Sequence, residues 1–142
     1  MSNFLDFSGV WLSKYRYHSD SRNKDFEDTH YVRIYQKRNH LVVESLPEAN
    51  ESYLIVNLTI HDNLATGSWE ETTSPKGYYK GSTYHGATQL IIEERGKRMH
   101  GKWLGIGRGG DINVGPYELP YIGKELPANA KPAKIEIAKA SL

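Results

Sequence analysis

Residues 52–72 read SYLIVNLTIHDNLATGSWEET, and this stretch indicates the fold most directly. Four aliphatic residues occupy every second position, so in an extended chain they share one face: Leu54, Val56, Leu58 and Ile60. Asp62-Asn63 is a turn signal, and extended alternation resumes at Ala65 and continues to Thr72. The stretch therefore predicts an antiparallel β-hairpin with one apolar face.

Similar short segments follow one another along most of the chain, separated by turn residues. The predicted strands are residues 10–18, 31–37, 41–46, 52–61, 65–72, 78–84, 87–94, 99–107 and 112–119. About eight or nine strands at spacings of roughly 8 to 12 residues are typical of an all-β sandwich or barrel. Sequential hairpins favour a closed or nearly closed antiparallel up-and-down barrel of about eight strands, because closure removes exposed sheet edges. Such a barrel encloses one small ligand or a filled core.

Two segments depart from this pattern. Residues 19–28 are polar and charged, and they predict a loop that holds a short helix or a flexible lid. From residue 125 the sequence becomes ELPANAKPAKIEIAKASL. This change predicts a barrel domain over residues 1–124 and a Pro/Ala/Lys-rich surface tail over residues 125–142. A strand at residues 134–138, or a partner-binding segment, is the alternative for the tail.

Composition excludes several classes of function. The chain has 142 residues, typical of one domain, and its 18 Lys plus Arg nearly balance 17 Asp plus Glu. A formal net charge of +1 excludes binding of duplex nucleic acid or anionic membranes through bulk charge. The absence of cysteine excludes disulfides and thiolate chemistry and fits a reducing cytoplasm, where we expect the protein. We recognise no signal peptide and no apolar run long enough for a membrane helix.

Each tryptophan follows a glycine by two residues, in the units 9–11 (GVW), 67–69 (GSW) and 101–103 (GKW). Because positions i and i+2 share a strand face, each glycine is expected to leave room beside a large ring. Core packing is the favoured role of the three indoles, with ligand stacking by Trp103 as the alternative. The first unit, preceded by Phe7-Ser8, resembles the Gly-x-Trp entry of the calycin superfamily, which includes lipocalins and fatty-acid-binding proteins. That resemblance implies a barrel with Trp11 inside.

A longer resemblance covers most of residues 7–119. Residues 73–81 (TSPKGYYKG), 84–87 (YHGA), 89–90 (QL) and 98–105 (RMHGKWLG) carry it. These motifs resemble an uncharacterised β-rich domain that follows a helix-turn-helix in actinobacterial regulators. We recognise no such helical unit here, so the resemblance implies no DNA binding. More distantly, the layout is similar to the barrel sensor of two-transmembrane effectors in CBASS antiphage systems, which implies a cyclic nucleotide as ligand.

Sequence motifs for catalysis and metal binding are lacking. The six histidines have no paired spacing typical of a metal site, although a single histidine, His85 or His100, is an alternative haem ligand. Glu70-Glu71 and Glu93-Glu94 are adjacent pairs, whose side chains point to opposite strand faces, so we expect solvated edge charges. There is no G-x-S-x-G elbow. The sequence favours a non-enzymatic protein without a cofactor.

Two stretches are suited to binding. Residues 77–86, GYYKGSTYHG, hold three of the ten tyrosines beside Lys80 and His85. Tyrosine rings with nearby cations suit a polar aromatic ligand such as a nucleotide, with strand packing in a filled barrel as the alternative. The glycine-rich residues 105–111 form a hairpin loop that is expected to bring Arg108 to the barrel rim, where it can contact an anion.

The sequence therefore predicts a small-molecule-binding barrel that senses or sequesters a polar ligand, with a cyclic nucleotide second messenger of antiphage signalling as the first candidate. The predicted ligand-binding residues are Tyr15, Tyr17, Tyr79, Tyr84, Trp103 and Arg108. One alternative is a carrier that holds an apolar ligand or haem against the face of Leu54 to Ile60. The other is a barrel without a cavity that acts as an interaction module. The sequence predicts no particular oligomeric state.

Overall fold

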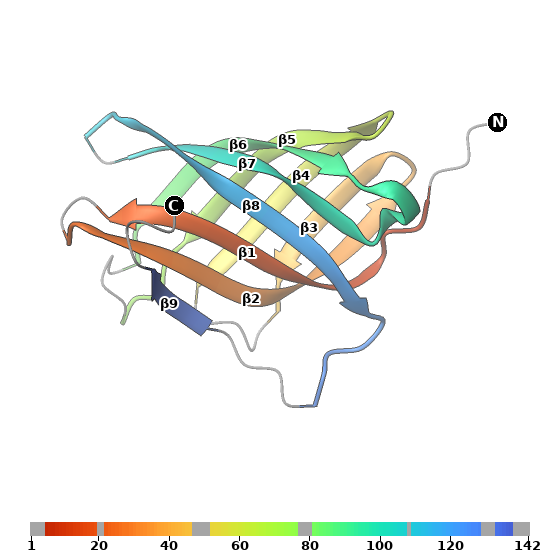
Figure 1. Ribbon diagram of the computed structural model, residues 1–142, viewed down its shortest axis with the longest axis horizontal. Coiled ribbons are helices and arrows are strands. Elements are labelled where there is room, and N and C mark those ends of the chain that lie inside the picture. The colour runs from red at the N-terminus through yellow and green to blue at the C-terminus, as the bar shows by residue number, and fades with distance from the viewer. Residues whose placement is uncertain are drawn as a thin grey trace.

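Eight antiparallel strands close into a barrel (Figure 1). The computed structural model describes residues 5–19, 22–46, 52–76, 81–107, 109–128 and 133–137. The barrel strands are β1 (Gly9–Ser19), β2 (Lys24–Lys37), β3 (His40–Ser45), β4 (Tyr53–His61), β5 (Leu64–Thr72), β6 (Thr83–Ile92), β7 (Arg98–Ile106) and β8 (Ile112–Gly123). Each strand pairs with its sequence neighbour, and β1 also pairs with β8. The predicted fold, an antiparallel up-and-down barrel of about eight strands, is confirmed.

Aliphatic side chains fill one end of the barrel, which we call the closed end. Val56, Leu58 and Ile60 of the predicted aliphatic face of β4 are buried there with Leu41, Leu90 and Met99, while Leu54 of that face is buried opposite Glu71. Trp11 has no exposed surface, and its Nε1 donates a hydrogen bond to the Phe7 carbonyl at 2.8 Å. Phe7 is itself buried against this cluster. The placement of Trp11 inside the barrel is thus as expected, and burial of these apolar groups is the main source of stability.

The prediction of a loop over residues 19–28 is wrong for most of that segment. β2 already begins at Lys24, and it pairs with β1 along the whole length of β1. Phe26, Asp28 and His30 are buried and lie opposite residues of β1 that face the interior. The second half of β2 was predicted as the strand at residues 31–37, but its first part was not. Two of the three inward side chains there are polar, so the apolar alternation that marks a half-buried strand is missing.

Two further strands differ from expectation. The predicted strands at residues 78–84 and 87–94 are replaced by the single strand β6, while residues 77–80 lie outside the described part of the chain. The segment after residue 124 contains β9 (Ala133–Ile137), which is the strand alternative for the tail. β3 ends opposite Val32, and β9 pairs with residues 25–29 of β2 (Figure 1). β9 therefore covers an edge of β2 that β3 does not reach.

The helical content of the described residues is one 3-10 turn, η1 (Glu94–Gly96), between β6 and β7. Within the same residues, no helix has the length and apolar character that crossing a membrane requires. Because the strands are joined mostly by short hairpin connections, those connections lie alternately at the two ends of the barrel (Figure 1). The turns at residues 38–39 and 62–63, together with η1, lie at the closed end.

Candidate functional site

Four predicted ligand-binding residues face the interior at the opposite end of the barrel. Tyr15 and Tyr17 continue the inward face of Trp11 on β1. Trp103 on β7 lies opposite Thr88 and Gly115, and Tyr84 on β6 lies opposite Glu71 of β5. Directly opposed residues of antiparallel strands share a face, so the register directs all four side chains toward the interior. Two other predicted site residues, Tyr79 and Arg108, lie outside the described residues, and their roles stay predictions.

We call this region the polar end, because its inward side chains include most of the buried polar groups of the interior. Tyr15 lies at its centre. The Tyr15 hydroxyl donates a hydrogen bond to Glu71 Oε2 at 2.6 Å. Its ring centroid lies 6.2 Å from that of Tyr17, 6.1 Å from that of His30 and 6.3 Å from that of Tyr117. Residues from four strands, β1, β2, β5 and β8, therefore meet around one phenol.

Burial and negative charge both act on Tyr15. Burial, followed by the charges of Glu71 and Asp28, raises the pKa of Tyr15 well above its ordinary value. Burial likewise raises the pKa of Tyr117, whose hydroxyl accepts a hydrogen bond from Ser13 Oγ at 3.0 Å. Both phenols are therefore protonated at neutral pH. They supply hydrogen-bonding groups and neutral aromatic surface to the interior.

His30 is the most unusual polar residue of the interior. Only 1% of it is exposed, and neither ring nitrogen has a hydrogen-bond partner among the described residues. Burial lowers the pKa of His30 from 6.5 to about 4, so the ring is neutral at pH 7 and offers one donor and one acceptor. A buried polar group without a partner costs roughly 1–3 kcal/mol of stability unless a water or another bound molecule satisfies it.

The indoles of Trp69 and Trp103 pack edge to face, with ring centroids 6.0 Å apart and an interplanar angle of 87°. Trp103 Nε1 donates to the Arg16 carbonyl at 3.0 Å, and Trp69 Nε1 donates to the Leu104 carbonyl at 3.0 Å. The Nε1 donors of both indoles are thus already bonded to backbone carbonyls of the barrel wall. These contacts agree with the favoured packing role, in which Trp103 offers a ligand only its ring surface.

The structure corrects the reason for the glycine-x-tryptophan spacing. A Cβ on Gly67 would lie 1.7 Å from the Asn57 carbonyl oxygen, and one on Gly101 would lie 2.0 Å from that of Gln89. These glycines allow neighbouring backbones to approach each other closely. Space for the indoles comes from glycines on other strand positions: Gly86 and Gly105 lie against Trp69, and Gly115 lies against Trp103.

Glu71, His30 and Asp28 are site residues that sequence reasoning missed. The prediction that the pair Glu70-Glu71 is solvated at a sheet edge is wrong for Glu71, which is half-buried and bonded to Tyr15, whereas Glu70 is exposed. Two-residue periodicity does signal this difference, because Glu71 shares a strand face with the buried Ala65 and with Trp69. For Asp28 and His30, the signal is that they lie two and four residues after Phe26, on the same strand face.

Solvent reaches the interior at the polar end. Tyr15, Tyr17, Glu71 and Tyr84 face inward, yet each is only half-buried in the structure. By contrast, inward residues at the closed end, such as Leu41, are completely buried. Asp28 and Glu71 place carboxylates at inward positions, and the exposed Lys24, opposite Ser19 at the start of β2, lies on the same face at the rim. The polar end is therefore accessible and aromatic, and it holds two inward carboxylates.

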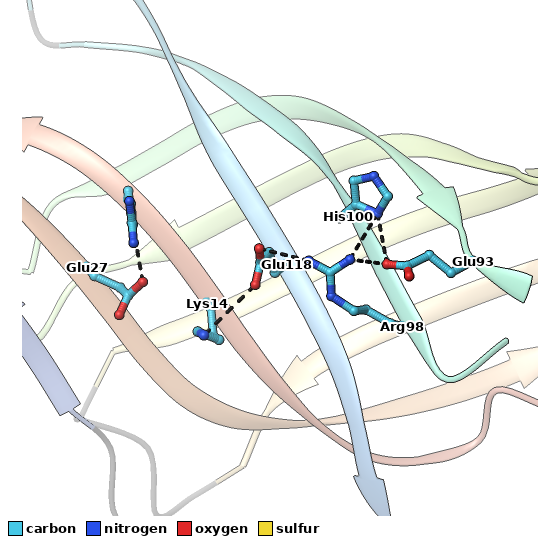
Figure 2. A network of polar contacts seen from close by, with 7 residues as sticks. Lys14, Glu27, Glu93, Arg98, His100 and Glu118 are labelled. Atoms are coloured by element: carbon cyan, nitrogen blue, oxygen red, sulfur yellow. Dashed lines mark hydrogen bonds and ion pairs between the residues drawn. The ribbon is translucent and has the colours of Figure 1, made fainter. Parts of the chain in front are cut away.

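A second polar network lies on the outer face (Figure 2). Glu118 of β8 accepts a hydrogen bond from Arg98 Nη2 at 2.9 Å and lies 3.9 Å from Lys14 Nζ. Arg98 also pairs with Glu93, whose Oε2 lies 3.0 Å from His100 Nδ1. The hydrogen bond from Arg98 lowers the pKa of Glu93. These side chains are partly exposed and partnered with one another, so the network links adjacent strands and adds little stability.

The alternative haem ligands also lie outside the interior. His85 is exposed, and His100 belongs to the outer network. Among the described residues, no group of three or more His, Cys, Asp or Glu side chains is placed to hold a metal ion. The chain matches no protein-family model, no curated protein and no solved structure. The resemblances to the calycin superfamily, the regulator domain and the antiphage sensor therefore stay predictions.

Proposed function

We propose that the protein is a non-enzymatic barrel that binds a small polar molecule at its polar end, to sense or sequester it. The observation that carries this proposal is the contrast between the two ends of the interior. Aliphatic side chains fill the closed end, whereas half-buried aromatic and polar side chains line the polar end around His30. Binding sites combine apolar and aromatic walls with a few convergent polar groups, and this end has that composition.

Within this class, a cyclic nucleotide second messenger of antiphage signalling stays the first candidate from the sequence. The rings of Tyr15, Tyr17 and Tyr84 support it, because aromatic side chains stack on nucleobases. The two inward carboxylates oppose deep entry of phosphate. A nucleotide would therefore place a base among the rings and its phosphates at the rim, where Arg108 is the predicted contact.

The alternative functions have less support. The aliphatic face proposed to line an apolar cavity, Leu54 to Ile60, packs in the hydrophobic core with Leu41 and Leu90. A haem carrier would need a ligand other than His85 or His100, since neither faces the interior; His30 is the inward candidate. A cavity-free interaction module would bind its partner through the outer face of the barrel, so it would not need accessible polar side chains on the inward face.

Thermal unfolding in the presence of a ligand panel tests the proposal. The panel contains cyclic di- and trinucleotides, neutral and cationic aromatic compounds, haem and a fatty acid. We expect at least one polar member to raise the Tm, because a ligand at about 100 times its Kd adds about 2.7 kcal/mol to the free energy of unfolding. Tyr15→Phe, which removes the hydroxyl bonded to Glu71, should reduce that shift.

Tyr35→Phe is the matched control for that variant. Tyr35 lies on the outer face of β2 and is 53% exposed, so its hydroxyl should not affect ligand binding. Absence of a shift with every polar member of the panel would contradict the proposal. A shift with haem or the fatty acid alone would favour the carrier alternative. For a nucleotide hit, Arg108→Ala should weaken binding if the predicted rim contact is correct.

A further inference from the structure

The charge of the polar end limits which ligands it can hold. Asp28 is 6% exposed on β2 and lies opposite Tyr15, which donates its hydroxyl hydrogen to Glu71 of β5. Both carboxylates therefore lie within reach of one ring, although 43 residues separate them in the sequence. Burial first, and then the charges of Glu71 and Asp28, raise the pKa of Tyr15, so further negative charge is unfavourable beside this ring. A ligand that brought another anion to this position would meet like-charge repulsion at low dielectric.

Aromatic rings surround these carboxylates. Tyr17 stacks on Phe26, with ring centroids 5.6 Å apart and an interplanar angle of 25°. Tyr15 meets Tyr117 edge to face, and Tyr84 lies opposite Glu71. Ring faces attract ammonium and guanidinium groups through their quadrupoles, and the attraction strengthens where water is excluded. The Arg22 guanidinium already lies 4.1 Å from the centroid of the Phe26 ring, so this aromatic wall holds a cation at its outer side. The remaining rings and the two carboxylates are together complementary to an organic cation.

A second, independent feature points to a ligand at this position. His30 lies opposite Ser13 on the inward face, its ring meets that of Tyr15 edge-on at an angle of 85°, and both its nitrogens are without partners among the described residues. The neutral ring can accept one hydrogen bond from a bound N–H or O–H group and donate another. The acidic residues are thus accompanied by a buried group whose hydrogen-bonding capacity is unused.

From this arrangement we infer that the polar end binds a small aromatic molecule with an ammonium group, with the ammonium beside Glu71 and Asp28 and the ring among the tyrosines. This inference rests on the proposed binding function, and it puts a cationic aromatic ligand in place of the cyclic nucleotide as the first candidate. It predicts selectivity by charge: cationic compounds bind, neutral analogues of the same shape bind more weakly, and anionic analogues are excluded.

Three probes of matched shape test this selectivity: phenethylamine, 2-phenylethanol and 3-phenylpropionate. The full chain is labelled with nitrogen-15, and each probe is titrated near neutral pH while amide and indole N–H signals are followed. The indole signals of Trp69 and Trp103 report on the polar end. We expect phenethylamine to bind at least about tenfold more tightly than 2-phenylethanol, and 3-phenylpropionate to cause no saturable shift.

Glu71→Gln and Glu70→Gln form a matched pair of variants. Both remove one charge from adjacent positions, but Glu71 faces the interior whereas Glu70 is exposed on the opposite face. Glu71→Gln should weaken phenethylamine binding by about tenfold and leave 2-phenylethanol binding unchanged. Glu70→Gln should change neither. The comparison of the three probes on the unaltered chain does not depend on either variant folding.

Each other outcome overturns the inference in a distinguishable way. Equal affinities of the amine and the alcohol would overturn the cation assignment and leave the proposed binding function standing. Tighter binding of 3-phenylpropionate would overturn it in favour of an anionic ligand such as a nucleotide. Unchanged amine affinity in Glu71→Gln would overturn the role of that carboxylate and with it the assignment. No response to any probe would overturn the assignment, while the thermal-unfolding panel decides the proposed function separately.

Discussion

At the scale of single residues, His30 makes the stability of the barrel depend on pH. The unfolded chain takes up a proton as the pH falls below about 6.5, whereas the folded barrel does so only near pH 4. The free energy of unfolding is therefore at its full value above the unfolded pKa and decreases as the pH falls to about 4. This single group accounts for a decrease of up to about 3 kcal/mol.

His30→Phe removes that titration and the two unpartnered nitrogens. In urea unfolding at about pH 7.5 and about pH 4.5, we expect the loss of stability on acidification to shrink by about 2 kcal/mol relative to the parent chain. His61→Phe serves as the control, because the His61 side chain is 91% exposed. If His30→Phe kept the full pH dependence of the parent, His30 would not be buried as a neutral ring.

At the scale of one element, β9 protects an edge of the barrel. The N-terminal half of β2 extends beyond β3, and β9 pairs with residues 25–29 along that edge. Removal of residues 129–142 should leave the barrel folded, because β1 still pairs with β2 from Gly9 to Ser19. The β2 amides that bond to β9 should exchange with solvent faster, and light scattering should show more self-association through the exposed edge.

A shorter truncation separates the strand from the residues that follow it. Removal of residues 138–142 alone retains β9, so amide protection at residues 25–29 should equal that of the full chain. Equal exchange in the two truncated chains would show that β9 does not protect β2 in solution. Because β1 occupies the other edge of β2, amides directed toward β1 provide an internal reference in each measurement.

At the scale of the whole molecule, closure of the barrel depends on how closely β8 approaches β1. A Cβ on Gly115 would lie 2.3 Å from the Arg16 carbonyl oxygen of β1 and 2.7 Å from Trp103 Nε1. Gly115→Ala should therefore separate these strands and weaken the hydrogen bond from Trp103 to Arg16. We expect chemical denaturation to show a loss of about 1–3 kcal/mol, with a red shift of tryptophan fluorescence.

Gly109→Ala is the matched control for closure. A Cβ at Gly109 would lie 3.8 Å from Asp111 Oδ2, which is an ordinary contact outside the strands. The free energy of unfolding of Gly109→Ala should stay within about 0.5 kcal/mol of that of the parent chain. If Gly115→Ala were as stable as Gly109→Ala, the approach of β8 to β1 would be looser than the structure indicates.

Local alternation is enough to predict much of this protein. The aliphatic residues of β4 predict a strand and its buried face from local sequence alone, because side-chain direction in a strand repeats every two residues. The same period places Tyr15 and Tyr17 on the face of Trp11. The all-β class and the up-and-down order follow from such segments and their short turns.

The sequence by itself therefore determined the barrel, its aliphatic face and the inward direction of the β1 tyrosines. Only the tertiary structure decided which polar residues share the interior. Tyr15 and Glu71 meet across 56 residues, and their contact depends on the register of every strand pair around the closed barrel. Asp28 and His30 were hidden because an inward polar side chain interrupts the apolar period. A local pattern records which way a side chain points, whereas non-local pairing decides what it faces.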